Sequence, residues 1–373
     1  MTEATATTEM GIPTPRRALI LKPCCIGDVL MATPLAWAIR ARWPDLRLDW
    51  AVDAHSRPVL EGNPHLTELI DASGCIRGDL RLRDWLRTAR ALRRRKYDTV
   101  FVPDRSPLLT LLARTTGAPT RVGLASGWRG WAHTVRVPTT PADARHESAI
   151  YMGLAEAAGI TGVGTARGEG GLDLRPVFVP SAEDARAAEG VLEGGLAGRD
   201  ATASREDAWP RIVLHPGGGE NPGTHMPSKR WPAERFGALA ARLASEGVEV
   251  LVVGGPGDRD LAARVVAVAS AGDSAASAAA APGRVIDLSG RLSLGATAAL
   301  IATADAYVGN DSGVAHLVAA VGTPVVVLFG PTSPERYGPA PGAGVAVVAE
   351  DLDHLAPGDV RDRVARVLAL PRA

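Results

Sequence analysis

Residues 306–316 read Ala-Tyr-Val-Gly-Asn-Asp-Ser-Gly-Val-Ala-His. The first three residues suit a buried strand, and the apolar residues that follow Gly313 suit the start of a helix. The polar residues between them form a turn. A strand that passes through a turn into a helix is the repeating unit of parallel sheets, so this stretch predicts an α/β fold.

Short apolar runs alternate with longer helical segments on both sides of this stretch. In the first half we expect strands at 18–22, 46–52, 67–71, 98–103 and 120–123, and helices at 27–42, 80–96, 106–116 and 146–158. In the second half we expect strands at 211–215, 248–254, 284–288, 305–308 and 324–329, and helices at 181–193, 232–246, 257–269, 293–303 and 312–321. This alternation is typical of parallel sheets with helices on both faces.

The alternation breaks in a glycine-rich region between residues 160 and 210, where we place a domain boundary near 175–205. A chain of 373 residues is long enough for about two domains. We expect a loose tail at 1–17, a first domain at 18–180, a second domain at 205–345 and a closing segment at 346–373. The apolar residues of 359–369 have helical spacing, and we expect this helix to pack back across the first domain.

The composition excludes several classes of protein. Lys plus Arg and Asp plus Glu are both 41, and a net charge of zero argues against nucleic acid as a partner. Three cysteines are too few for a disulfide framework, and no apolar run approaches the roughly 20 residues of a membrane helix. We therefore expect a cytoplasmic protein.

Ligands of open parallel sheets bind at the carboxyl ends of strands, so the polar turn at 309–316 is the strongest candidate site. Ser312 and Gly313 place free backbone N–H groups at a helix N-terminus, which favours an anion. His316 follows Ser312 by four residues and lies on the same helix face.

Asp28 stands at the start of a helix after the first predicted strand. One interpretation is an N-cap, in which the carboxylate accepts a backbone N–H bond. The other is a general base, because the helix dipole keeps such a carboxylate ionised at neutral pH.

Two further loops carry candidate residues. Lys229 precedes a predicted helix that begins at Pro232, and it is either a charge for a phosphate or a solvated neighbour of a packed Trp231. Asp258 follows another strand and is either a helix cap or an acceptor for ribose hydroxyls. The glycine run 217–219 lacks the Lys-Ser/Thr ending of a nucleotide hydrolase loop.

Three stretches together resemble glycosyltransferase family 9, the bacterial heptosyltransferases. They are Ile26-Gly27-Asp28-Val29-Leu30 with Thr33-Pro34, Ser228-Lys229-Arg230-Trp231-Pro232, and Gly309-Asn310-Asp311-Ser312-Gly313 with His316, Gly322-Thr323-Pro324 and Phe329-Gly330-Pro331-Thr332. They span residues 18 to 338 in the family's order. The sequence departs from the family at Cys24-Cys25, where small polar residues are usual, and in an Ala-rich insertion at 270–283.

The resemblance implies a GT-B architecture, with two Rossmann-like domains facing across a cleft. It implies an inverting, metal-free transfer of heptose or a related sugar from an ADP-sugar donor to a hydroxyl of a glycan or glycolipid. No cofactor is expected besides this nucleotide-sugar co-substrate. Asp28 matches the family's proposed base, and the donor-binding positions match Lys229, Asp258, Asp311, Ser312, Gly313 and His316.

Other interpretations stay open. A secondary metabolite can replace the lipopolysaccharide acceptor of the family, and the same fold also serves nucleotide-sugar epimerases and hydrolases. The segment 87–96 is crowded with basic residues, among them Arg94 and Arg95. It is either a solvated helix face or a surface for an anionic acceptor or for the inner face of an anionic membrane.

Overall fold

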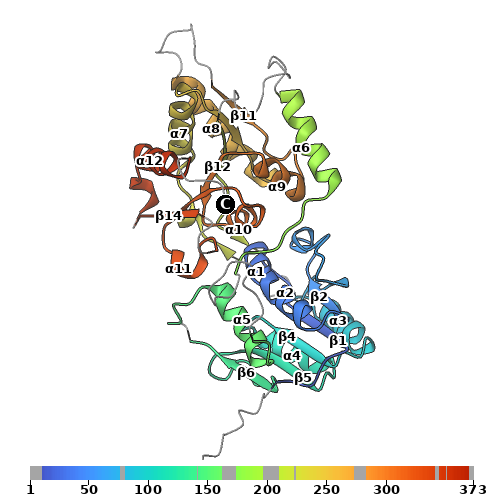
Figure 1. Ribbon diagram of the computed structural model, residues 1–373. Helices are drawn as coiled ribbons and strands as arrows, with labels where there is room; N and C mark the ends of the chain where they lie inside the picture. The colour runs from blue at the N-terminus through green and yellow to red at the C-terminus, as the bar shows by residue number, and fades with distance from the viewer. Residues whose placement is uncertain are drawn as a thin grey trace, which may run out of the picture. The chain divides into compact units, whose positions relative to one another are not determined.

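The computed structural model describes residues 11–75, 80–140, 142–161, 174–195, 210–221, 224–272, 283–340, 344–349 and 351–368. The chain divides into two compact units. The first contains residues 1–24, 31–57 and 63–174, and the second contains 25–30, 58–62 and 175–373. Each unit is built around a parallel six-stranded sheet (Figure 1).

The sheet of the first unit has the strand order β3-β2-β1-β4-β5-β6. Its strands are β1 (Arg17–Leu21), β2 (Arg47–Val52), β3 (Glu68–Asp71), β4 (Thr99–Val102), β5 (Thr120–Ala125) and β6 (Val135–Pro138), and every pairing is parallel. The helices of this half of the sequence are α1 (Ile26–Met31), α2 (Thr33–Arg42), α3 (Leu82–Arg94), α4 (Pro107–Thr115) and α5 (Glu147–Ala157). Of these, α1 groups with the second unit except for its last residue. The buried faces of α3 and α4 share one hydrophobic core with β1 and β4.

The second unit repeats this plan with the order β11-β10-β7-β12-β13-β14. Its strands are β7 (Arg211–His215), β10 (Glu249–Val252), β11 (Arg284–Asp287), β12 (Ala306–Asn310), β13 (Val325–Phe329) and β14 (Gly344–Val348). Its longer helices are α6 (Ala182–Gly195), α7 (Ala233–Ser245), α8 (Arg259–Gly272), α9 (Leu294–Ala302), α10 (Gly313–Val321) and α12 (Pro357–Leu368). One core lies under α7, α8 and α12, and another lies under α9 and α10, so helices cover both faces of the sheet.

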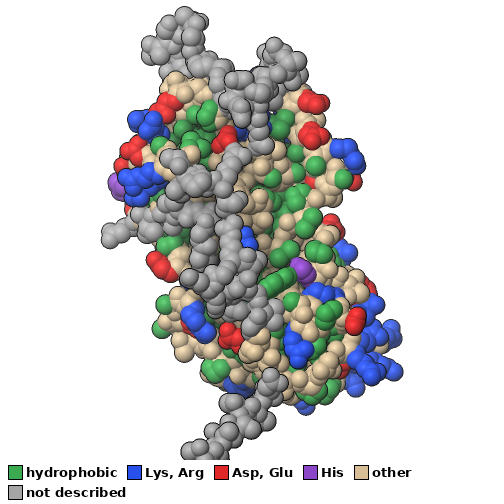
Figure 2. Space-filling model, viewed as in Figure 1, with side chains coloured by type: hydrophobic (Ala, Val, Ile, Leu, Met, Phe, Trp, Pro, Cys, Tyr) green, Lys and Arg blue, Asp and Glu red, His purple; other side chains and the backbone are tan. Residues whose placement is uncertain are grey.

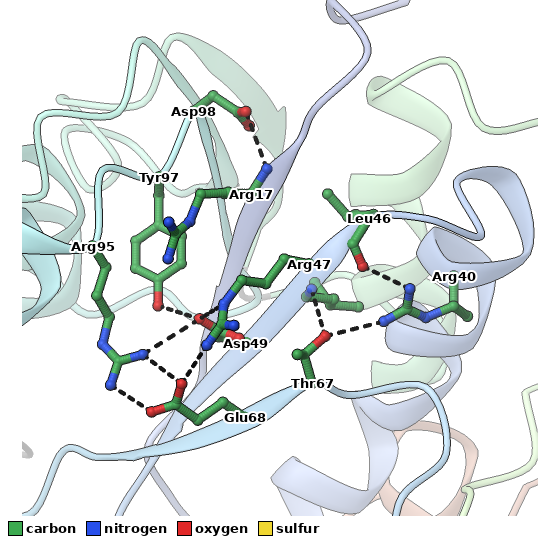
Figure 3. A network of polar contacts seen from close by, with 11 residues as sticks. Arg17, Arg40, Leu46, Arg47, Asp49, Thr67, Glu68, Arg95, Tyr97 and Asp98 are labelled. Atoms are coloured by element: carbon green, nitrogen blue, oxygen red, sulfur yellow. Dashed lines mark hydrogen bonds and ion pairs between the residues drawn. The ribbon is translucent and has the colours of Figure 1, made fainter.

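At the amino ends of the central strands, the two sheets carry the same pair of hydrogen bonds between an arginine and an aspartate. In the first unit, the backbone N of Arg17 donates to Asp98 Oδ2 at 3.1 Å, and the N of Asp98 donates to the carbonyl of Arg17 at 3.0 Å (Figure 3). In the second unit, Arg211 and Asp305 make the same two contacts at 2.7 and 2.8 Å. The first pair thus joins β1 to β4, and the second pair joins β7 to β12.

All ten predicted strands are present, and the helix predicted at 27–42 divides into α1 and α2. The sixth strand of each sheet, β6 and β14, was not predicted from the sequence. The closing helix α12 packs within the second unit, where Val360, Val364 and Val367 enter the core beside α7, whereas we expected it across the first domain. Most of the insertion expected at 270–283 lies outside the described residues.

Within the described ranges, no helix is both long enough and apolar enough to cross a lipid bilayer.

Candidate functional site

The order of strands in the second sheet reverses between β7 and β12. In open parallel sheets the carboxyl ends of the strands at such a point form the usual ligand site. Asn310, the last residue of β12, is fully buried there. Its side-chain amide donates to the carbonyls of Pro216 and Gly217, each at 3.0 Å, and its Oδ1 accepts from the backbone N of Trp231 at 2.9 Å. Asn310 therefore fixes two loops against the end of β12.

Asp311, the next residue, is held by two side chains from distant segments. The ammonium group of Lys229 lies 2.6 Å from Asp311 Oδ2, and the hydroxyl of Thr332 donates to the same oxygen at 2.6 Å. Both charged side chains are largely buried. The interpretation of Lys229 as a solvated side chain is therefore wrong, because its ammonium group binds Asp311 in the polar turn after β12.

The polar turn leads directly into α10. Ser312 occupies the N-cap position in extended backbone conformation, and within the described residues its side chain makes no capping hydrogen bond. Gly313 is the first residue of the helix. The first N–H groups of α10 therefore have no side-chain cap from Ser312, and the helix dipole makes this end attractive to an anion.

His316 lies one turn further along α10 and is buried. Its position on the helix agrees with the spacing argument made from the sequence. The donor-binding roles of His316, Ser312 and Gly313 stay predictions.

The glycine-rich loop after β7 approaches the same turn. Gly218 and Gly219 have positive φ angles of 116° and 71°, which side chains other than glycine rarely adopt. A Cβ atom added to Gly218 would lie 3.1 Å from Cβ of Ser312. Glycine at these positions lets the loop pass close to the start of α10 and present its backbone there.

Asp258 serves as a cap in the structure. Its Oδ2 accepts from the backbone N of Gly255 at 2.9 Å, and His215 Nε2 lies 3.7 Å away. Burial raises the pKa of the Asp258 carboxyl, but His215 and the Gly255 N–H outweigh burial and hold that pKa below its ordinary value. The capping interpretation is therefore confirmed, and the contact of Asp258 with a ribose stays a prediction.

The first sheet has its own reversal of strand order, between β1 and β4. An ion pair occupies that point: Lys22 Nζ lies 2.8 Å from Asp104 Oδ2, and only 5% of the Lys22 side chain is exposed. Burial raises the pKa of Asp104, but the Lys22 ammonium more than offsets it, so the net pKa is lowered. Trp50 Nε1 donates to the carbonyl of Lys22 at 2.9 Å, which fixes the chain just before α1.

Asp28 lies in the first turn of α1, after β1, and is partly exposed. The helix begins at Ile26, so Asp28 is the third helical residue. The N-cap interpretation of Asp28 is therefore wrong. The interpretation as a general base stays a prediction.

Arg94 and Arg95 lie at the end of α3 and just beyond it. The guanidinium of Arg95 donates to Glu68 at 2.7 Å and lies 3.7 Å from Asp49, in the network shown in Figure 3. Arg94 is exposed. Arg95 thus supports the amino edge of the first sheet, and contact of either arginine with an acceptor stays a prediction.

The sequence argument missed the roles of Asn310 and Thr332. Asn310 is the last residue of β12, and Thr332 lies just after the carboxyl end of the neighbouring strand β13. The rule that ligands gather at this edge could have found Thr332, because Phe329-Gly330-Pro331-Thr332 leaves β13 there. Within the described residues, no cluster of three or more His, Cys, Asp or Glu side chains is placed to hold a metal ion.

Two Rossmann-like units, each with a polar cluster where its strand order reverses, define the class of this fold. The structure resembles that of the glycosyl transferase family 9 protein from Veillonella parvula, with a TM-score of 0.76 and 22% identity over 95% of this chain and 97% of that one. It also resembles the ADP-heptose lps heptosyltransferase II of Escherichia coli, with a TM-score of 0.71 and 24% identity over 94% and 98% of the two chains. The fold is therefore GT-B.

Sequence comparison identifies the family. The family model for glycosyltransferase family 9 (heptosyltransferase) matches residues 85–356. Lipopolysaccharide heptosyltransferase 2 of Escherichia coli strain K12 is 29% identical over 321 residues, 86% of this chain and 84% of the relative. Lipooligosaccharide heptosyltransferase 2 of Haemophilus influenzae is 23% identical over 86% and 85% of the two chains. The chain belongs to glycosyltransferase family 9, and the expectation of a glycosyltransferase is confirmed.

Proposed function

We propose that this glycosyltransferase moves a heptose, or a related sugar, from an ADP-sugar to a hydroxyl of a lipopolysaccharide-type glycolipid. The names of the sequence relatives support the sugar and the acceptor, since they are lipopolysaccharide and lipooligosaccharide heptosyltransferases. Two related Escherichia coli structures hold ADP and an ADP-2-deoxy-2-fluoro heptose, and these support the nucleotide. The observation that carries the proposal is the Lys229–Asp311–Thr332 contact beside the start of α10.

The donor's diphosphate fits the start of α10. The uncapped N–H groups at Ser312 and Gly313 and the helix dipole favour negative charge, and Lys229 adds a positive charge on the neighbouring side of the turn. Lys229 and Thr332 both engage Oδ2 of Asp311. The proposal gives the other carboxylate oxygen, Oδ1, the role of accepting a hydroxyl of the sugar.

In the proposed reaction, Asp28 accepts the proton of the acceptor hydroxyl while its oxygen attacks the anomeric carbon of the sugar. The bond between that carbon and the diphosphate oxygen breaks, its electron pair leaves with the nucleoside diphosphate, and the configuration at the carbon inverts. Lys229 and the N-terminus of α10 stabilise the charge that develops on the leaving group. These groups do the work of a divalent cation, so we propose that the transfer needs neither metal nor cofactor.

The test is transfer by the purified full-length protein, followed by release of ADP and by mass of the acceptor. ADP-heptose, UDP-glucose and GDP-mannose are each offered with and without a heptose-acceptor core glycolipid. We expect turnover with ADP-heptose and acceptor together, of unchanged rate in excess EDTA. Activity lost in EDTA and restored by magnesium or manganese contradicts the metal-free mechanism.

The same assay tests the other candidate functions. Donor turnover without an acceptor indicates a hydrolase or an epimerase of this fold. Turnover with a small-molecule alcohol, and none with the glycolipid, would indicate that the acceptor is a secondary metabolite.

A further inference from the structure

Helix α3 presents apolar side chains to solvent. Leu82 is 70% exposed and Leu86, one turn later, is 36% exposed. Leu80, just before the helix, is 47% exposed. At about 3.6 residues per turn, Leu82 and Leu86 lie on one stripe of the helix surface. None of these three leucines is among the buried residues of the core that α3 and α4 share.

A stripe of positive charge lies beside the leucines on α3. Arg83, Arg87, Arg90 and Arg94 are exposed and follow each other at spacings of four, three and four residues, so they share one side of the helix. The acidic residue of this helix is Asp84, which pairs with Arg87 at 2.9 Å. In Figure 2 the basic side chains gather at the edge of the first unit where Figure 1 places α3. The exposed face of α3 therefore keeps a strong positive charge.

The opposite face of α3 anchors it to the fold. Trp85, Ala89 and Leu92 enter the core between the helix and the sheet. The chain runs from the carboxyl end of β3 to the start of α3. The helix then runs back and ends at Arg94, near the amino edge of the sheet. Leu80 and Leu82 thus lie toward the carboxyl edge, the edge at which open parallel sheets bind ligands.

We propose that the exposed face of α3, made of Leu80, Leu82, Leu86 and the arginine stripe, docks on an anionic lipid bilayer. Arginine side chains and exposed leucines on one helix match the two components of a membrane surface, acidic headgroups and acyl chains. A nucleic acid would engage the arginines but would leave the leucines in water, and so fits this face less well. The docking holds the carboxyl edge of the first sheet beside the membrane, where the headgroup of a lipid acceptor is presented.

The test is co-flotation of the purified full-length protein with lipid vesicles, which does not depend on transferase activity. One set of vesicles is phosphatidylcholine, and the other contains phosphatidylglycerol as well. We expect binding to the anionic vesicles alone, weakened as salt rises. Arg83→Gln, Arg87→Gln, Arg90→Gln and Arg94→Gln should each lower the partition coefficient about fivefold. Leu82→Ser with Leu86→Ser should also weaken binding.

The matched control is Arg363→Gln with Arg366→Gln, which removes exposed charges from α12 of the second unit. It should bind vesicles as the unchanged protein does. All substituted side chains are exposed, and melting curves check that each variant folds; Leu82→Ser alone replaces any combined variant that unfolds. The proposal is overturned if the protein does not float with anionic vesicles, if the α3 variants bind as well as the control, or if RNA and not vesicles binds in proportion to the arginines.

Discussion

Lys229 and Thr332 bind one and the same carboxylate oxygen, Asp311 Oδ2, each at 2.6 Å. Lys229 precedes α7, and Thr332 follows β13, so two segments far apart in the sequence meet on the turn after β12. These two contacts fix the orientation of the Asp311 carboxylate. The charge of Lys229 is partly neutralised before any ligand arrives, which determines how substitutions at these positions should behave.

Replacement of Lys229 by alanine should weaken ADP binding about 10- to 100-fold. The variant loses a positive charge and also leaves the Asp311 carboxylate unpaired beside the bound diphosphate. Calorimetry with ADP measures the effect. The double variant Lys229→Ala with Asp311→Asn distinguishes the two causes: recovery of ADP affinity means that Lys229 acts by neutralising Asp311, and no recovery means that it contacts the phosphate itself. If the single variant binds ADP with unchanged affinity, Lys229 is not part of the donor site.

Thr332→Val keeps the shape of the side chain and deletes the hydroxyl that donates to Asp311. We expect kcat/KM for the sugar donor to fall about tenfold, because a hydrogen bond to a charged group is lost. Affinity for ADP should hardly change, since ADP lacks the transferred sugar that Asp311 is proposed to orient. Thr332→Ser, which retains the hydroxyl, should restore the rate. An equal loss in both variants would instead indicate a packing role for Thr332.

Asp28→Asn should abolish transfer while ADP affinity stays within about twofold of the original, because only the proton acceptor is removed. Asparagine is compatible with the first turn of a helix, so α1 should persist. Rapid-quench measurement of transfer and calorimetry with ADP are done on the same preparation. Transfer at an undiminished rate rejects Asp28 as the base, and loss of ADP affinity makes it a donor ligand.

Acidification should destabilise the protein through His133. This side chain is buried beneath β5, and burial first, then Arg121 and Arg136, lowers its pKa to about 4. The unfolded chain has an ordinary histidine pKa of about 6.5 and so binds more protons than the folded chain between these values. The free energy of unfolding should therefore fall as pH drops from about 6.5 to 5. In urea titrations, His133→Gln should make this dependence shallower; an unaltered slope assigns the effect to other groups.

Asn310→Ala should lower the free energy of unfolding by about 2–3 kcal/mol, because the carbonyls of Pro216 and Gly217 and the N–H of Trp231 lose their buried partner. Thermal or urea unfolding measures this. Thr303→Ala, which removes a partly buried hydroxyl at the other end of the same sheet, provides the comparison. Equal losses in the two variants would show that Asn310 has no special part in joining the loops.

The sequence predicted the interior strands well because each is a short apolar run between recognisable turns. It did not predict β6 (Val135–Pro138) and β14 (Gly344–Val348), the last strand of each sheet. The run at 135–138 is four residues long, and Arg136 separates its two valines, so it has little apolar signal. Its strand conformation depends on the partner β5, which local sequence does not reveal.

Single-residue interpretations were less secure where the deciding contact is remote. A lysine beside a tryptophan looks solvated, yet Lys229 meets Asp311 across 82 positions of sequence. The N-cap alternative for Asp28 could not be rejected from the sequence, because the start of α1 cannot be located to within two residues from its pattern. For Asp258 the sequence left capping and ribose binding open, and the structure shows the capping contact, with Gly255 three residues away in sequence.

The equivalent pairs Arg17–Asp98 and Arg211–Asp305 show that each sheet is held together at its amino edge without residues of the other sheet. Each half of the protein closes the same edge of its sheet with its own residues, in the same strand order. Each sheet is complete in its own strands, although residues 25–30 and 58–62 of the first half of the sequence group with the second unit. Recombination between relatives that exchanges one sheet would therefore leave the backbone hydrogen bonds of the other sheet complete.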